Sequence, residues 1–224
     1  MKIVAVIPAY NEEKNIERVV RELRPHVSEV VLVDDGSSDA TGERANRAGA
    51  WVLTHAINRG QGAALATGMK FAVDNLNADI IINYDADGQH SSEEIDAIVK
   101  PIMIGRADVV LGSRFLNNNS NVPFFRKIVL KAGIIFSRIT SGLKITDTHN
   151  GFRAFTGEAA KKIRITQDRM AHASEILDEI GRNNLRYVEV PVTIRYTKES
   201  MEKGQSSLNS VRIVWEYFSG KLFK

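Results

Sequence analysis

The sequence predicts an α/β fold in which helices flank an open, mostly parallel sheet. Short runs of branched apolar residues, typical of strands buried on both faces, recur through the first half of the chain. Each run is followed by a polar turn and then by a stretch with apolar residues at helical spacing. Strands and helices that alternate in this way form right-handed crossover units, and such units build an open parallel sheet.

The expected strands are short, and those in the first half of the chain are apolar runs. Residues 2–7 form the first, and Pro8, which cannot donate to a strand ladder, is expected to end it. Later runs stop at polar turns, such as the one that begins at Asp34. The expected strands cover residues 2–7, 30–33, 51–54, 80–84 and 108–111, with a further one over 187–196 that Pro191 interrupts.

Helices are expected where apolar residues recur three and four positions apart. Asn11 and the two glutamates after it open the first helix, whose apolar face runs from Ile16 to Leu23. The expected helices cover residues 11–23, 41–48, 63–75, 95–104 and 171–183, with another that begins near residue 157.

Two more helices are expected over residues 123–143 and 208–224. Both mix aliphatic and aromatic residues with lysine and arginine, the composition of a helix at a membrane interface. Packing against the sheet or against a second subunit would explain the same composition. We therefore expect one main domain over residues 1–206 and a C-terminal amphipathic helix over 207–224, with both helices peripheral to the sheet.

Composition narrows the class of protein. A chain of 224 residues, 43% of them apolar, can build one sizeable core. The formal charge of +3 argues against a nucleic-acid partner, and the absence of cysteine excludes disulfides and Cys-ligated zinc and fits a reducing cytoplasm. The N-terminus does not resemble a signal peptide, and no run reaches the roughly 20 apolar residues that span a bilayer. Any membrane contact is expected to be peripheral.

The stretch Ile80 to His90 holds the densest cluster of polar candidates. After the buried run come Asp85, Asp87 and Gln89, which with His90 bring four ligand-type side chains into six positions. Two neighbouring carboxylates repel unless a cation lies between them, and oxygen ligands favour Mg²⁺ or Mn²⁺. Alternatively, the two aspartates cap a helix that starts near Ser91.

The polar turns after the first four strands are expected to meet. In open α/β sheets, ligands bind outside the carboxyl ends of the parallel strands. Four segments that are far apart in sequence should therefore line one crevice: P-A-Y-N-E, D-D-G-S-S-D, N-R-G-Q-G and D-A-D-G-Q-H.

Six motifs together carry a family resemblance. In order they are P-A-Y-N-E-E, V-D-D-G-S-S-D-A-T, N-R-G-Q-G-A-A-L, D-A-D-G-Q-H, G-S-R and D-T-H-N-G-F-R-A-F. They resemble the inverting family 2 glycosyltransferases, which have the Rossmann-like GT-A fold, and more narrowly the polyprenyl- and dolichyl-phosphate sugar synthases. The resemblance covers nearly all of the chain up to about residue 196.

The resemblance implies a donor site and a metal site. Asp34 would recognise the nucleotide base, while Asp85 and Asp87 would hold Mg²⁺ or Mn²⁺ with Gln89 as a further ligand. Family members often have lysine where Gln61 stands, so one phosphate contact is absent here. The remaining residues expected to bind the donor are Pro8, Tyr10, Glu12, Asn58 and Gly62.

The resemblance also implies an acceptor site. Arg114 and Arg126 match residues that hold the acceptor phosphate, although Leu130 stands where some members have a phosphate-binding serine. Asp147 and Arg153 are expected beside the sugar, as catalytic residues or as a structural ion pair. His149 is a further candidate near the diphosphate or metal, and Glu175 stands where many members carry a general base.

The expected activity is transfer of a sugar, with inversion, to a polyprenyl phosphate. The donor would be UDP-glucose, UDP-N-acetylglucosamine or GDP-mannose, and the site would face the cytoplasmic side of a membrane. A small membrane protein or a second copy of the chain is an expected partner. Two alternatives stay open: a family 2 transferase that acts on a saccharide or protein hydroxyl with Glu175 as base, and a non-catalytic nucleotide-sugar binding module.

Overall fold

The computed structural model describes residues 1–116, 134, 138, 140–148 and 150–194. Most of the helix expected over 123–143 and all of the helix expected over 208–224 lie outside these residues. The proposed boundary between 1–206 and 207–224 lies outside them too, as do Arg126, Leu130 and His149. In the part of the chain that the structure describes, no helix is long and apolar enough to cross a membrane.

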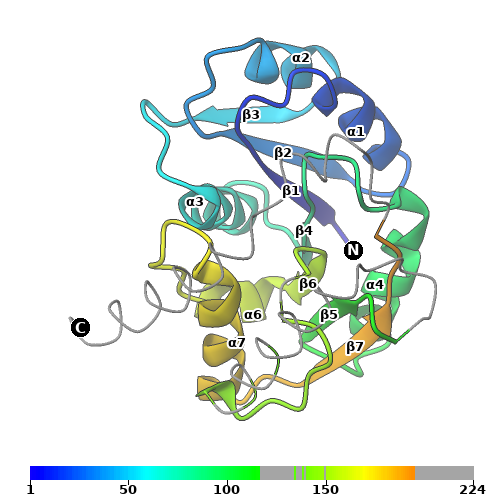
Figure 1. Cartoon of the computed structure of the whole chain (residues 1–224). Helices are drawn as coiled ribbons and strands as arrows, with labels where there is room; N and C mark the ends of the chain where they lie inside the picture. Colours follow the sequence, from blue (N-terminus) through cyan, green and yellow to red (C-terminus); the bar gives the residue numbers. More distant parts are fainter. Residues whose placement is uncertain (117–133, 135–137, 139, 149, 195–224) are drawn as a thin grey trace.

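A seven-stranded sheet in the order β3-β2-β1-β4-β6-β5-β7 forms the centre of the molecule (Figure 1). Neighbouring strands are parallel except at β6, which is antiparallel to both β4 and β5. The sheet is therefore mostly parallel, as expected. Its strands are β1 (Ile3–Ala9), β2 (Glu29–Asp34), β3 (Trp51–Thr54), β4 (Ile80–Asn83), β5 (Val109–Ser113), β6 (Arg153–Thr156) and β7 (Tyr187–Pro191).

Helices cover both faces of the sheet. Helices α1, α2 and α4 pack on one face, and α3, α6 and α7 pack on the other (Figure 1). The helices are α1 (Ile16–Leu23), α2 (Thr41–Arg47), α3 (Gln61–Asp74), α4 (Ile95–Met103), α6 (Gly157–Lys162) and α7 (His172–Arg182), and a 3₁₀ turn, η1 (Ser92–Glu94), precedes α4.

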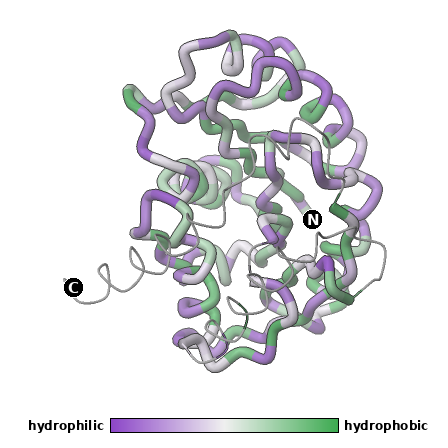
Figure 2. The backbone as a smooth tube through the Cα atoms, viewed as in Figure 1, coloured by the Kyte–Doolittle hydropathy of each residue, from purple (hydrophilic) through white to green (hydrophobic). Residues whose placement is uncertain are grey.

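The continuous apolar runs are explained by burial on both faces. In β4, Ile80 and Ile82 point into the core beneath α1 and α4, whereas Ile81 points into the core beneath α3 and α7. All three are completely buried. Figure 2 shows the apolar strands beside the more polar outer turns. Alternate side chains of one strand thus fill two separate cores.

Gly68 allows α3 to lie close to the sheet. A Cβ atom at this position would lie 2.4 Å from Cγ1 of Val6 and 3.0 Å from Cγ2 of Val33. The close approach brings the first residue of α3, Gln61, to the edge of the sheet where the strands end.

Several details of the predicted elements were wrong. Strand β7, expected to continue through Pro191 to residue 196, ends at Pro191, and residues 192–194 are not part of a strand. Strand β6 was not predicted, because it is short, begins with the charged Arg153 and follows a polar loop. Strand β1 continues through Pro8 to Ala9. Proline is tolerated here because β1 pairs with β4 only as far as Val6, so that beyond Val6 no N–H group of β1 has to donate to β4. Helix α1 begins only at Ile16.

Candidate active site

The first two polar turns are joined by hydrogen bonds. Asn11 has a left-handed backbone with φ of 55°. Its side-chain Oδ1 accepts from the backbone N–H of Ser38 at 2.9 Å. The backbone N–H of Glu12 donates to Oγ1 of Thr41 at 2.8 Å. The loop after β1 and the turn after β2 therefore lie against each other at this end of the sheet.

Hydrogen bonds also connect the turns after β3 and β4 to this end of the sheet. Asp35, which is 3% exposed, accepts from the backbone N–H groups of Arg59 at 3.0 Å and Gly60 at 2.6 Å. Nε2 of Gln61 donates to Oδ1 of Asp85 at 3.0 Å. The expected convergence of four turns at the carboxyl ends of the parallel strands is thereby confirmed.

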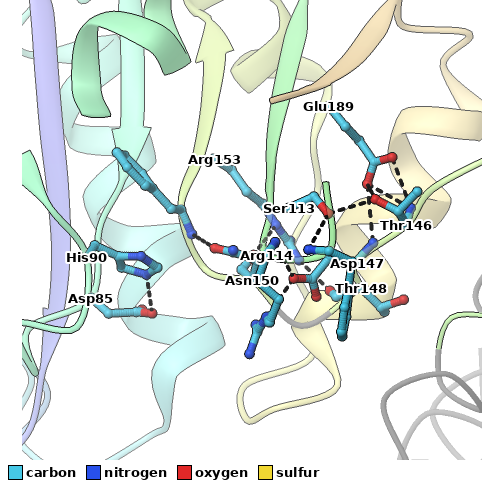
Figure 3. A network of polar contacts seen from close by, with 12 residues as sticks. Asp85, His90, Ser113, Arg114, Thr146, Asp147, Thr148, Asn150, Arg153 and Glu189 are labelled. Atoms are coloured by element: carbon cyan, nitrogen blue, oxygen red, sulfur yellow. Dashed lines mark hydrogen bonds and ion pairs between the residues drawn. The ribbon is translucent and has the colours of Figure 1, made fainter. Parts of the chain in front are cut away.

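The Asp85 carboxylate lies at the centre of this arrangement. Its second oxygen, Oδ2, lies 3.1 Å from Nε2 of His90 (Figure 3). Burial alone would raise the pKa of Asp85, but the hydrogen bond with His90 and the charge of Arg153 hold it below the ordinary value. His90 is in turn packed against the rings of Tyr84 and Phe152, at centroid distances of 5.5 and 5.1 Å.

Asp87 behaves differently from Asp85. Burial, followed by the neighbouring charge of Asp85, raises the pKa of Asp87 from 3.8 to about 6. Its Oδ1 accepts a local hydrogen bond from the backbone N–H of Gln89 at 2.9 Å. Opposite pKa shifts of two carboxylates in one turn indicate repulsion between them, and a cation bound between the two would relieve that repulsion.

The alternative that the two aspartates cap a helix is wrong. The residue at the N-cap position of η1 is Ser91, and its side chain makes no capping hydrogen bond. Asp85 contacts Gln61 and His90, while Asp87 bonds within its own turn. The hydrogen bonds of both acids are therefore made to the turns and not to the start of the helix.

The donor atoms of this turn fit Mg²⁺ or Mn²⁺. Within the described ranges, no group of three or more histidine, aspartate or glutamate side chains is spaced to hold a metal. Mg²⁺ in nucleotide sites is commonly held by one or two carboxylates and completes its shell with substrate phosphates and water. Asp85 and Asp87 match that requirement, with the amide oxygen of Gln89 as a further candidate ligand.

A hollow of about 530 Å³ opens next to Asp34, between α2 and β3. Oδ1 of Asp34 accepts from the backbone N–H of Ser37 at 2.9 Å, and a Cβ on Gly42 would lie 2.9 Å from Oδ2. Tyr10 is 49% exposed near the same end of the sheet, whereas Pro8 is buried within β1. An acidic, partly open hollow suits a nucleobase that offers N–H groups.

Asn58 and Gly62 occupy different surroundings. Asn58 is exposed, and its backbone N lies 2.8 Å from where a Cβ on Gly36 would stand. Gly62 is buried beneath the carbonyl oxygen of Gln167, which a Cβ would approach to 2.0 Å. The glycine at position 62 is therefore required by protein packing.

Arg114 and Asp147 form a buried ion pair. Oδ2 of Asp147 accepts from Nε of Arg114 at 2.6 Å and from its backbone N–H at 3.1 Å (Figure 3). Glu189 on β7 supports the pair, because its carboxylate accepts from the backbone N–H groups of Thr146 at 2.8 Å and Asp147 at 3.2 Å. The guanidinium of Arg114 is thus held in one orientation.

The side chain of Arg153 is hydrogen-bonded to the backbone of the loop that precedes β6. Its Nε donates to the carbonyl of Asn150 at 3.0 Å, and Nη2 donates to the carbonyl of Thr148 at 2.9 Å. Burial lowers the pKa of Arg153 to about 10, against the opposing effects of Asp147 and Asp85. The ion pair that the structure shows for Asp147 is with Arg114, so the expected Asp147–Arg153 pair was assigned to the wrong arginine.

Glu175 on α7 is hydrogen-bonded to the segment before it. Its carboxylate accepts from the backbone N–H groups of Thr166 and Gln167, both at 2.8 Å, and from the hydroxyl of Thr166. One turn earlier, Nδ1 of His172 donates to the carbonyl of Arg169 at 2.7 Å. Burial lowers the pKa of His172 to about 4, so this imidazole is neutral at pH 7.

Sequence reasoning missed several residues that build the site. The sequence motifs assign no role to Asp35 or His172, and they place Glu189 only within a strand. Asp35 also lies 2.7 Å from Nδ1 of His55, whose Nε2 lies 3.0 Å from Oγ1 of Thr67. The doubled acid at 34 and 35 was a signal that both carboxylates have a role.

The fold is that of known glycosyltransferases. The structure is similar to glucosyl-3-phosphoglycerate synthase from Mycobacterium tuberculosis, solved with Mg²⁺ and uridine diphosphate, with a TM-score of 0.71. The two chains are 21% identical, and the match covers 96% of this chain and 79% of the other. The mostly parallel open sheet with its flanking helices is a GT-A fold.

Sequence comparison identifies the family. The model for glycosyl transferase family 2 matches residues 4–164. The UDP-N-acetylglucosamine–dolichyl-phosphate N-acetylglucosaminyltransferase of Methanococcus voltae is 32% identical, over 99% of this chain and 97% of that protein. The undecaprenyl-phosphate mannosyltransferase of Micrococcus luteus is 31% identical, over 86% and 83%. The chain belongs to glycosyl transferase family 2.

Proposed function

We propose that the chain transfers a sugar, with inversion, from a nucleotide-sugar donor to the phosphate of a polyprenyl phosphate. The observation that carries the proposal is the acidic pair Asp85 and Asp87 at the end of β4, joined through Gln61 to the turn before α3. The relatives at 32% and 31% identity are named for dolichyl phosphate and undecaprenyl phosphate, which supports the acceptor.

Asp34 would select the donor through its base. A carboxylate accepts the ring N–H that uracil and guanine both present, and the hollow beside Asp34 leaves room for either base. Pro8, Tyr10, Glu12 and Asn58 would complete the donor site. One relative is named for UDP-N-acetylglucosamine and another is a mannosyltransferase, so UDP-glucose, UDP-N-acetylglucosamine and GDP-mannose are the donors to test.

Asp85 and Asp87, with Gln89, would hold Mg²⁺ or Mn²⁺ beside the diphosphate. Such a cation, when bound, neutralises negative charge on the departing nucleoside diphosphate. The structurally similar enzyme from M. tuberculosis was solved with uridine diphosphate and each of these ions, which supports the choice of metal.

The acceptor phosphate would bind to Arg114, with Arg126 as a second contact. Because Asp147 fixes Nε of Arg114, the guanidinium is oriented before the acceptor arrives, which lowers the entropic cost of alignment. A phosphate oxygen forms the new bond to the anomeric carbon. The bond from that carbon to the diphosphate oxygen breaks on the opposite side, and its electron pair leaves with the nucleoside diphosphate.

No side chain needs to remove a proton in this reaction. The acceptor phosphate is already an anion at neutral pH, so its oxygen is nucleophilic without a general base. Glu175, which occupies the position of a family base, already accepts hydrogen bonds from Thr166 and Gln167. This observation favours a phosphate acceptor over a hydroxyl acceptor, for which a free base would be required.

Access to the lipid would come from peripheral membrane contact at the cytoplasmic face. The basic and apolar segments 122–143 and 207–224 would supply that contact, either directly or through a small membrane protein or a second copy of the chain. Sedimentation with anionic liposomes tests the direct mode. Protein that stays wholly in the supernatant would count against it.

The proposed activity is tested by a donor panel. Radiolabelled UDP-glucose, UDP-N-acetylglucosamine and GDP-mannose are each incubated with undecaprenyl or dolichyl phosphate and Mg²⁺ or Mn²⁺. We expect one donor to give an organic-extractable product that is lost in the Asp87→Ala variant. Donor binding without transfer or hydrolysis, under every acceptor, would contradict the proposal and favour a non-catalytic binding module.

A further inference from the structure

Residues 166–169 lie directly on the start of α3. The carbonyl of Asp168 accepts from the backbone N–H of Ala63 at 3.1 Å. A Cβ on Gly60 would lie 2.5 Å from that same carbonyl oxygen, and a Cβ on Gly62 would lie 2.0 Å from the carbonyl oxygen of Gln167. Only glycine at these two positions allows the segment to sit so close.

Two N–H groups in the turn at residues 58–62 and the start of α3, which would otherwise be available to a ligand, are hydrogen-bonded within the protein. The backbone N–H of Gly60 donates to Asp35, and that of Ala63 donates to Asp168. These two N–H groups are therefore occupied by protein acceptors, although N–H groups at a helix start often bind phosphate. These hydrogen bonds hold the turn in place and thereby fix the position of Gln61.

Glu175 on α7 also holds the 166–169 segment. Its carboxylate, 9% exposed, accepts from the backbone N–H groups of Thr166 and Gln167 and from the Thr166 hydroxyl. Hydrogen bonds to an ionised acceptor are among the stronger ones in proteins. The buried carboxylate is therefore well suited to anchor the segment.

A continuous series of contacts connects Glu175 with Asp85. The 166–169 segment rests on the turn before α3, and Gln61 is the first residue of that helix. Nε2 of Gln61 then donates to Asp85 at 3.0 Å. A loss of the anchor at Glu175 would loosen the segment, the start of α3 and the orientation of Asp85.

We propose that Glu175 is a positioning residue that acts through residues 166–169 and Gln61 on Asp85. The general-base role that family members assign to this position is not the role of Glu175 here. The proposal rests on the proposed function in one respect, because it takes Asp85 to be part of the donor site.

The first experiment measures the anchor without any substrate. Amide hydrogen exchange is followed in peptides that cover residues 58–70 and 164–172, with trypsin cleavage after the exposed Arg164 and Arg169 as a second readout. In Glu175→Gln we expect exchange in both peptides to rise about tenfold, the effect of losing roughly one charge-assisted hydrogen bond. Glu158→Gln, on the exposed face of α6, is the matched acid-to-amide control and should behave like wild type.

A pair of variants at Thr166 separates the hydroxyl from the shape of the side chain. Thr166→Ser keeps the hydroxyl that donates to Glu175, and Thr166→Val removes it while keeping the volume. We expect the valine variant to share the faster exchange of Glu175→Gln and the serine variant to resemble wild type. A valine variant with wild-type exchange would contradict the anchoring role.

Kinetics distinguish positioning from base catalysis. In Glu175→Gln we expect KM for the donor to rise about tenfold while kcat falls much less, because a looser site weakens donor binding. Wild-type exchange combined with a large loss of kcat and an unchanged donor KM would overturn the proposal and make Glu175 a base. If wild type transfers nothing to polyprenyl phosphate, the proposed function fails, yet the exchange data still decide whether Glu175 anchors the segment.

Discussion

Replacing Asp87 with asparagine should stabilise the protein in the absence of metal. Asn keeps an oxygen that can accept from the backbone N–H of Gln89, so the change removes charge and little else. The pKa of Asp87 rises from 3.8 to about 6 on folding, through burial and then the charge of Asp85. If fully expressed, that rise corresponds to roughly 3 kcal/mol of destabilisation at neutral pH. Because Asp87 is partly exposed, we expect about 1–2 kcal/mol.

The sign of the pH dependence follows from the raised pKa. The folded state holds its proton more tightly than the unfolded state, so stability is full below about pH 4 and falls as pH rises through about 6. The advantage of Asp87→Asn should therefore be small near pH 4 and complete at pH 8. Urea unfolding in EDTA at a series of pH values measures it, with the exposed Asp96→Asn on α4 as a control.

Metal should reverse this order of stability. With Mg²⁺ and uridine diphosphate at about 100 times their dissociation constant, wild type should gain roughly 2.7 kcal/mol, and Asp87→Asn should gain far less. If Asp87→Asn is less stable than wild type in EDTA at pH 8, the acidic pair is not under repulsion and the reasoning fails.

The remaining predictions concern packing, the acceptor and the metal. Gly68→Ala forces a methyl group against Val6 and should cost about 1–3 kcal/mol in urea unfolding; an unchanged midpoint would refute that close contact. Arg114→Lys loses the Nε bond to Asp147 and should raise KM for polyprenyl phosphate about tenfold, with donor KM unchanged as the internal control. EDTA should abolish transfer and added Mg²⁺ or Mn²⁺ should restore it, whereas activity that persists in EDTA would exclude the metal.

The sheet could be predicted from sequence because its signals are local. Runs such as Ile80–Ile82 are apolar throughout because both faces of the strand are covered, and the short length of the run between polar turns favours a buried strand. Strand β6 gives no such signal, since its first residue is the buried Arg153 and it pairs with strands distant in sequence. Its existence depends on tertiary pairing that a single sequence does not display.

The site was predictable where chemistry concentrates in one turn, and less so where it depends on contacts between turns. Asp85 and Asp87 stand out because two acids follow a buried strand. The partner of Asp147 was missed because Arg114 lies 33 residues away, whereas Arg153 is near in sequence. The anchoring contacts of Glu175 could not be predicted either, since a family motif indicates a residue's position and not its hydrogen bonds.

The most direct test of the account is a comparison of two acceptors that differ only in their phosphate. Wild-type protein is given the active donor, Mg²⁺ and either a polyprenyl phosphate or the corresponding polyprenol, and the initial rate of extractable labelled product is measured. We predict rapid transfer to the phosphate and none above background to the alcohol. Equal transfer to both, or transfer to the alcohol alone, would contradict the phosphate acceptor and require a base that the proposed mechanism does not include.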